Sequence, residues 1–221
     1  MQALIFDFDG LILDTELPEF LSWQQIYQSM GHELPFEMWC RCIGTSASAF
    51  DPIAYLHTLA GSFDQERIIQ DRHAILYELL GKQSLLPGVL NYFQDAKKMG
   101  LKLAVASSSP LNWVSSHLRQ HHIDHFFDAI CTREDVAVVK PNPALYQTAL
   151  RRLQVNAEDA IAFEDSPNGI KAAVEAGIYC VAVPNQLTSR MDTSHANMHI
   201  ASFASVPLQT LLRQLAVAAY D

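Results

Sequence analysis

The chain has 221 residues, of which 49% are hydrophobic and 18% are charged, and its formal net charge is −9 at pH 7. This composition is typical of a globular protein with a full core, and the length suits one domain carrying an inserted segment. The negative charge argues against nucleic-acid binding, which depends on basic surface. No apolar run reaches the roughly 18 residues that span a bilayer, and the N-terminus lacks the features of a signal peptide. We therefore expect a cytoplasmic protein, most simply a monomer, without nucleic-acid or membrane partners.

The cysteines do not form a pattern with a chemical function. They are scattered along the chain, and only Cys40 and Cys42 are close in sequence. No second thiol pair follows them at the spacing of a zinc site. We therefore expect reduced thiols and no zinc centre.

The first predicted element is a buried strand that begins at Ala3. Its four apolar residues run without alternation, as in a parallel strand that is covered on both faces. Asp7 and Asp9 follow directly, and Gly10 allows the backbone to turn sharply. Burying a charged carboxylate is costly, and two neighbouring carboxylates repel each other. This arrangement predicts a cation between them, which we expect to be Mg²⁺.

From residue 15 to residue 86 the sequence has helical periodicity and no convincing strand. Apolar residues between Phe20 and Met30 recur at helical spacing, and Gly31 closes this segment. Pro35 is expected to open a short helix that Gly44 ends, and two further amphipathic segments cover residues 49–59 and 65–80. We predict a small all-helical domain, residues 15–86, inserted into a core made of residues 1–14 and 87–221.

After residue 87, apolar strands alternate with amphipathic helices. Ser109 is expected to cap one of these helices and Pro110 to occupy its first turn. The expected strands cover residues 101–106, 126–131, 159–163 and 178–183. The expected helices cover residues 89–98, 111–120, 143–153, 167–176 and 206–219. Such alternation predicts an α/β fold with a doubly wound parallel sheet.

Three predicted strands end abruptly in polar side chains, and a lysine precedes a proline. In an open α/β sheet, ligands bind outside the carboxyl ends of the strands, so these distant segments can meet in one crevice. Carboxylates suit Mg²⁺, whereas serine hydroxyls and amides at a helix start can donate to phosphate oxygens. The groups concerned are Asp7 and Asp9, Ser107 and Ser108, Glu164 and Asp165, and Lys140.

Four short motifs in this order identify a family. The sequence resembles the haloacid dehalogenase superfamily, in particular its β-phosphoglucomutase-like phosphatase branch, in which a helical cap is inserted after the first strand. The resemblance extends over nearly the whole chain. The motifs are Asp7-Phe8-Asp9-Gly10, Ser107, Lys140-Pro141 and the segment from Glu164 to Gly169.

The resemblance implies a role for each motif residue. Asp7 would be the nucleophile that forms an aspartyl-phosphate, and Asp9 would act as general acid and then as general base. Ser107 and Lys140 would hold the transferring phosphoryl group. Substrate or phosphate would also contact Phe8, Ser108, Gly44 and Trp23. The Mg²⁺ ligands would come from Asp7, the main-chain carbonyl of Asp9, Glu164 and Asp165.

Departures from the mutase pattern favour a phosphatase of small phosphorylated metabolites. The mutase has a histidine where this chain has Glu19, and it has an arginine after the cap glycine where this chain reads Thr45–Ser48. The presence of Asp9 argues against a dehalogenase, because dehalogenases of this superfamily lack the second acid. A hexose-phosphate mutase is the alternative within enzymes. A phospho-accepting signalling module is the alternative of another class, although receiver domains are shorter and have no helical insert.

Other features have simpler interpretations. The Asp-x-Asp pair could belong to a calcium loop, but such loops follow a helix and have a third oxygen donor. Trp23 and its aromatic neighbours fit a helical core better than a pocket, although Trp23 lies close to the start of the insert. Four histidines fall near one helix end, where they are expected on the surface rather than on a metal; these are His117, His121, His122 and His125.

Overall fold

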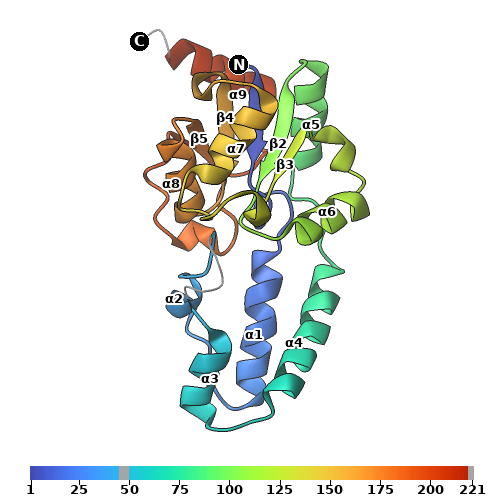
Figure 1. Cartoon of the computed structure of the whole chain (residues 1–221), viewed down its shortest axis with the longest axis vertical. Coiled ribbons are helices and arrows are strands. Elements are labelled where there is room, and N and C mark those ends of the chain that lie inside the picture. The colour runs from blue at the N-terminus through green and yellow to red at the C-terminus, as the bar shows by residue number, and fades with distance from the viewer. Residues whose placement is uncertain (45–49, 219–221) are drawn as a thin grey trace.

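The computed structural model describes residues 1–44 and 50–218. Figure 1 shows an α/β part at one end of the molecule and a bundle of helices at the other. The segment Thr45–Ser48, where the mutase arginine is absent, lies outside the described residues. None of the described helices combines the length and the apolar character needed to cross a membrane.

A six-stranded sheet forms the centre of the α/β part. Its strand order is β3-β2-β1-β4-β5-β6, and every neighbouring pair is parallel. The predicted doubly wound parallel sheet is therefore confirmed, with the short β6 as an addition that the sequence did not indicate. The strands are β1 (Ala3–Phe6), β2 (Lys102–Ala106), β3 (Ala129–Cys131), β4 (Ala160–Glu164), β5 (Tyr179–Ala182) and β6 (Met198–His199).

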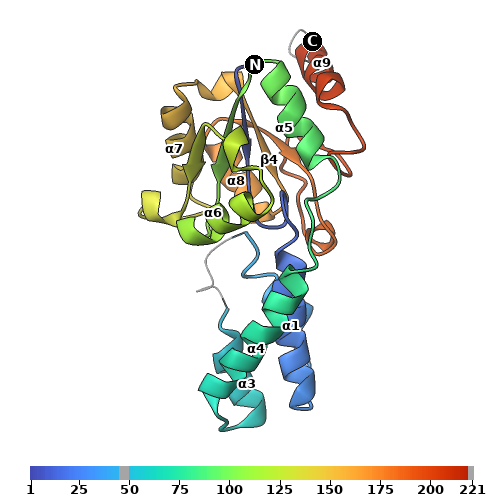
Figure 2. The same cartoon turned by 90° about the vertical axis from the view of Figure 1, so that its right-hand side faces the viewer.

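Helices cover both faces of this sheet, and the two faces have different chemistry. Helices α5 (Val89–Lys98), α6 (Leu111–Gln120) and α9 (Leu208–Ala218) cover one face, whereas α7 (Ala144–Leu153) and α8 (Pro167–Glu175) cover the other. Figure 2 shows α5 and α9 on the side opposite α7. The first face is rich in aromatic rings, with Phe6 stacked on Phe163 at a centroid distance of 4.9 Å. The second face is rich in alanine, which lets α7 and α8 approach the strands closely.

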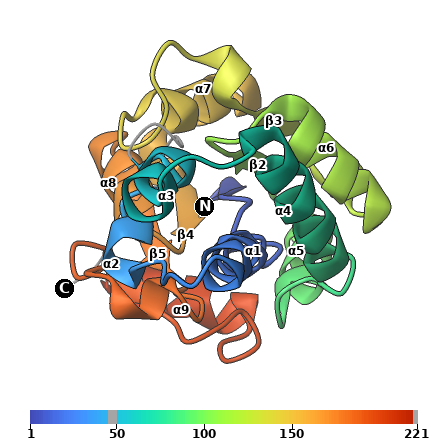
Figure 3. The same ribbon diagram turned by 90° about the horizontal axis from the view of Figure 1, so that it is seen from below.

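The helical part consists of α1 (Glu16–Ser29), α2 (Phe36–Trp39), α3 (Pro52–Ala60) and α4 (Gln65–Leu80). These four helices lie in front of the sheet when the molecule is seen from below (Figure 3). Only Phe36–Trp39 of the predicted Pro35–Gly44 helix is helical, because hydrogen-bonded turns replace the helix from Cys40 onward. Short 3₁₀ turns connect elements elsewhere, namely η2 (Asp124–Phe126), η3 (Arg133–Asp135), η4 (Ala157–Asp159) and η5 (Thr188–Arg190).

The chain passes between the two parts at adjacent points. Leu13 and Leu85 form an isolated antiparallel bridge, and Leu86 N donates to Ile12 O at 3.0 Å. Leu187, which follows β5, packs into the apolar core of the helical part. The division into a core and an inserted domain stays a prediction. The connections nevertheless place the carboxyl end of β1 next to the start of α1.

Candidate active site

A buried lysine joins two carboxylates at the carboxyl ends of the central strands. Lys140 Nζ lies 2.7 Å from Asp7 Oδ1 and donates to Glu164 Oε1 at 2.6 Å. All three side chains are almost inaccessible, with Lys140 only 1% exposed. Asp7 follows β1 and Glu164 ends β4, which are neighbours in the sheet. The structure thus brings together residues that are more than a hundred positions apart in sequence.

The protonation of this group is strongly perturbed. Burial raises the pKa of Asp7 to about 7, with Glu164 adding to the rise and Lys140 opposing it. Burial acts against the charge of Lys140, but attraction to Asp7 and Glu164 outweighs it and raises the lysine pKa. Burial, followed by repulsion from Asp7 and Glu164, also raises the pKa of Asp165 well above its usual range. The cluster holds more negative charge than its single ammonium can balance.

This excess of carboxylates fits a divalent cation. Asp7, Glu164 and Asp165 each offer an oxygen, and these three oxygens lie within 4.8 Å of one another. Mg²⁺ prefers oxygen ligands and is held by few carboxylates together with water and phosphate oxygens. Among the described residues, the carboxylate of Asp9 is not part of this cluster, and metal binding by its main-chain carbonyl stays a prediction. The residues present are therefore suited to hold Mg²⁺.

Two side chains that the sequence did not single out orient the acidic residues. Tyr146 of α7 donates its hydroxyl to Glu164 Oε1 at 2.5 Å, and its ring centre lies 5.2 Å from Lys140 Nζ. Asn185, after β5, donates to Asp165 Oδ2 at 2.7 Å and to Gly10 O at 3.0 Å. Such outer contacts fix the direction of metal-binding carboxylates.

Two glycines allow close approach at the same site. Gly10 has φ +76°, and a Cβ there would lie 2.6 Å from both Asn185 and Asp165. Gly44, which belongs to the helical part, has φ +71°, and its Cβ would lie 2.0 Å from Ser166 Oγ. Next to it, Asn168 Nδ2 donates to Ile43 O at 3.1 Å. The predicted site residue Gly44 therefore contacts the α/β part beside Asp165.

Asp9 has entirely different surroundings from Asp7. Its Oδ1 accepts hydrogen bonds from Thr15 Oγ1 at 2.7 Å and from Trp113 Nε1 at 2.8 Å. Its Oδ2 accepts one from Ser109 Oγ at 2.6 Å, and Ser107 Oγ lies 3.4 Å away. The prediction that Ser109 caps the next helix is wrong, because its hydroxyl is used by Asp9.

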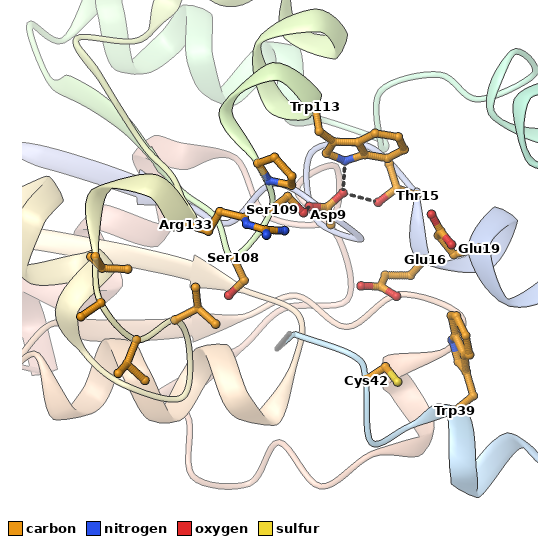
Figure 4. A pocket seen from close by; sticks show the side chains of 15 residues that line it. Asp9, Thr15, Glu16, Glu19, Trp39, Cys42, Ser108, Ser109, Trp113 and Arg133 are labelled. Carbon is orange, nitrogen blue, oxygen red and sulfur yellow. Dashed lines mark hydrogen bonds between the residues drawn. The ribbon is translucent and has the colours of Figure 1, made fainter. Parts of the chain in front are cut away.

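A cavity of about 750 Å³ opens beside Asp9 (Figure 4). One wall is acidic and comes from Glu16 and Glu19 of α1, whereas the facing wall is the aliphatic run 136–139. The Arg133 side chain points toward Ser108 and Ser109 in Figure 4. A smaller hollow lined by Asp7, Asp9, Glu16, Gly44, Ser107, Ser108, Ser109 and Lys140 holds the predicted catalytic groups.

The side chains of Phe8 and Trp23 do not line this cavity, and their contact with substrate or phosphate stays a prediction. Phe8 is 1% exposed and packs into the core of the α/β part. Trp23 is buried in the helical part, where the guanidinium of Arg72 lies 5.2 Å from its ring centre. Arg72 also pairs with Glu19. Trp39 lines the cavity instead.

The histidines form no metal site among the described residues, where only the three acids above are suitably grouped. His122 and His125 are exposed, as expected. His117 differs, because its ring packs edge-on against Trp113 at a centroid distance of 4.5 Å. Its role is therefore packing beside the cavity.

A family model described as haloacid dehalogenase-like hydrolase matches residues 4–183. The chain belongs to this family. A putative phosphatase from Bacillus subtilis, YhcW, is 42% identical over 97% of this chain and 98% of its own. A phosphorylated carbohydrates phosphatase from Thermotoga maritima is 31% identical over 80% of this chain and 82% of its own. The crystal structure of a CbbY mutant from Rhodobacter sphaeroides in complex with xylulose 1,5-bisphosphate superposes with a TM-score of 0.75 at 28% identity, covering 96% and 99% of the two chains. This member of the haloacid dehalogenase-like hydrolases is thus an enzyme of the phosphatase type.

Proposed function

We propose that this enzyme is a Mg²⁺-dependent phosphatase that hydrolyses small phosphorylated metabolites through an aspartyl-phosphate on Asp7. The observation that carries the proposal is the contact of Lys140 with Asp7 and Glu164 beside Asp165. A lone ammonium and a group of carboxylates around a dication suit a phosphoryl group, because positioning and charge stabilisation supply most of the catalysis in phosphoryl transfer.

In the first half of the reaction, an oxygen of Asp7 attacks phosphorus while the bond from phosphorus to the alcohol oxygen breaks. Asp9 gives its proton to the departing alcohol oxygen. Lys140 and Ser107 hold the phosphoryl oxygens. Bound Mg²⁺ would supply the positive charge that keeps the clustered carboxylates ionised and offsets the phosphoryl charge.

In the second half, the ionised Asp9 takes a proton from water as the water oxygen attacks phosphorus. The bond between phosphorus and Asp7 breaks, and inorganic phosphate leaves. Asp9 ends the cycle protonated and Asp7 ends it free, so atoms and charges balance. Acid and base roles require a carboxyl held close to the reacting oxygen, and the hydrogen bonds around Asp9 provide that support.

We further propose that residues 15–86 act as a cap over the site. Thr15 at the start of α1 binds Asp9, and Asn168 of α8 binds the Ile43 carbonyl. These contacts join the helical part to the catalytic end of the sheet. A closed cap excludes bulk water from the reaction and completes the substrate cavity.

The cavity suits a small polar substrate with one phosphate. Among its described lining residues it offers a second phosphate a single cation, Arg133, beside the acids Glu16 and Glu19. Glu19 occupies the position of the mutase histidine and is paired with Arg72, so it is poorly suited to replace that histidine. The phosphatase is therefore preferred over a mutase. Repeated turnover would separate it from a signalling module that accepts a single phosphate.

The test compares Asp7→Asn with Asp14→Asn. Both replace a carboxylate by an amide near the start of the chain, but Asp14 only accepts a hydrogen bond from Leu17 N at the beginning of α1. With Mg²⁺ and p-nitrophenyl phosphate, we expect Asp7→Asn to lose turnover completely and Asp14→Asn to stay within about threefold of the wild type. Circular dichroism should show both variants folded. A fully active Asp7→Asn variant would overturn the proposal.

A further inference from the structure

Among the hydrogen bonds that described side chains make to the Asp9 carboxyl, only that of the Trp113 indole cannot reverse its direction. The three hydroxyls around Asp9, from Thr15, Ser107 and Ser109, can either donate or accept by rotating, whereas an indole N–H can only donate. Trp113 Nε1 donates to Asp9 Oδ1 at 2.8 Å. Oδ1 must therefore remain an acceptor, and a proton on this carboxyl belongs on Oδ2.

We propose that Trp113 is a positioning residue that directs the exchangeable proton of Asp9 to Oδ2. The proposal rests on the proposed function, in which Asp9 is the acid and the base. Oδ2 is the oxygen beside Ser107, and Ser107 lines the hollow that also contains Asp7 and Lys140. The proton is thus held on the side of the carboxyl that faces the reacting phosphoryl group.

Local packing keeps the indole in place. Trp113 lies in the first turn of α6, directly after the serines that follow β2, so one strand-to-helix junction supplies both the hydroxyls and the indole. His117, four residues later on the same helix, packs edge-on against the indole at 4.5 Å. On the other side, Trp113 also lines a second cavity of about 420 Å³ next to Leu80 and Gly81. The indole therefore separates two cavities and is held by its own helix.

The proton balance assigns a purely directional role to Trp113. Its N–H bond stays intact throughout the reaction. The proton on Asp9 Oδ2 passes to the leaving oxygen as the bond from phosphorus to that oxygen breaks and the bond from Asp7 to phosphorus forms. In the hydrolytic half, the attacking water returns a proton to Oδ2. Removing the indole N–H should therefore harm proton transfer more than nucleophilic attack.

Leaving groups of different acidity separate these two effects. Nitrophenolate leaves without being protonated, whereas phenolate is a poorer leaving group and needs the acid more. For Trp113→Phe, we expect kcat/KM with phenyl phosphate to fall about 10- to 100-fold, the usual range for a misplaced acid. With p-nitrophenyl phosphate the loss should stay below about threefold, because attack by Asp7 is unaffected. The two substrates differ only in a nitro group, so binding differences are small.

Trp39→Phe is the matched control. Trp39 lines the same cavity, but its Nε1 has no hydrogen-bond partner in the described part of the chain. Whatever its effect on activity, the Trp39→Phe substitution should change kcat/KM for both substrates in the same proportion. An equal loss on both substrates with Trp113→Phe would reduce Trp113 to a structural role. A gain with phenyl phosphate would show that the indole holds Asp9 unproductively, which also overturns the inference. A wild-type enzyme inactive on both substrates would instead overturn the proposed function and this inference with it.

Discussion

Asp7 and Asp9 are two positions apart at the end of one strand, yet the regions around them are opposites. Around Asp7 the neighbours are charged, buried and contributed by the ends of strands, with Lys140 and Glu164 in direct contact. Around Asp9 the neighbours in hydrogen-bond contact are neutral donors, such as Thr15, and the side chain is partly exposed to a cavity. Two chemically identical side chains therefore have different surroundings, which suit the different tasks proposed for them.

The difference follows from what each task requires. Asp7, the proposed nucleophile, would attack a negatively charged phosphoryl group and needs positive charge nearby, which Lys140 would supply. An acid and base must change charge twice in each cycle, and neutral donors accommodate both states without a fixed counter-ion. Both aspartates line the same small hollow while differing in environment, as the proposed reaction requires.

The substitution expected to have the largest effect on the charged region around Asp7 is Lys140→Met. It leaves buried carboxylates without their ammonium, which typically costs about 3–5 kcal/mol of folding free energy. Turnover of p-nitrophenyl phosphate should fall by at least about 10³-fold, because phosphoryl charge stabilisation is lost. Urea unfolding and steady-state kinetics measure the two effects. Lys102→Met is the control, since Lys102 at the start of β2 donates to Leu153 O, away from the site. Activity within tenfold of the wild type would contradict the role of Lys140.

A milder change in the same region is Tyr146→Phe, which removes one hydroxyl and leaves the ring beside Lys140. We expect Mn²⁺ affinity, measured by titration calorimetry, to weaken about tenfold, as is usual when an orienting contact to a metal ligand is lost. Turnover at saturating Mg²⁺ should change little. Tyr92→Phe is the buried control, because the Tyr92 hydroxyl donates to Val206 O on the opposite face of the sheet from Tyr146. Unchanged Mn²⁺ affinity in Tyr146→Phe would contradict the role in orientation.

The smallest expected effect concerns Glu16 on the cavity wall. Although part of it faces the cavity, protein surrounds its carboxyl, and this desolvation raises the pKa from 4.5 to about 8, with Asp9, Asp7 and Asp14 adding to the rise. The folded protein therefore binds this proton more tightly than the unfolded chain, so stability is lost as pH rises from about 4.5 to about 8.

Glu16→Gln should flatten that dependence. Between pH 5 and pH 8, with a chelator present, the decrease in Tm should be about 2–4 °C smaller than in the wild type, which corresponds to roughly 1 kcal/mol for a chain of this size. Differential scanning calorimetry at the two pH values gives the comparison. Glu66→Gln, at the exposed first turn of α4, is the control and should follow the wild type. An identical slope in Glu16→Gln would show that this carboxyl does not titrate as described.

Local sequence signals predicted much of the fold because they act over a few residues. Apolar runs and the glycine and proline residues beside them predicted most strand bounds to within one residue, although β3 begins at Ala129 rather than at residue 126. Helices α4 and α5 have the predicted bounds. Motif spacing indicated which strand ends meet. The position of Lys140 beside Asp7 agrees with that expectation, whereas the proposed catalytic roles await kinetics.

The missed features depend on contacts between distant segments. Nothing local distinguishes Trp113 from any amphipathic tryptophan, or Tyr146 from a core tyrosine, because their hydrogen-bond partners are far away in sequence. Ser109 has the sequence of a helix cap, but its hydroxyl donates to the Asp9 carboxyl instead of capping the helix. β6 was missed because two residues are too short for any periodicity.

The loop after β5 contacts both the acidic cluster and the helical part. Asn185 fixes Asp165, and two residues later Leu187 inserts into the core of the helical part, while the guanidinium of Arg190 lies 5.0 Å from the ring centre of Phe36. Exchanging residues 15–86 for those of a relative would leave this loop facing a foreign surface. We therefore expect a working chimera to need residues 184–191 transplanted along with the helices, so that specificity would be carried by two segments rather than one.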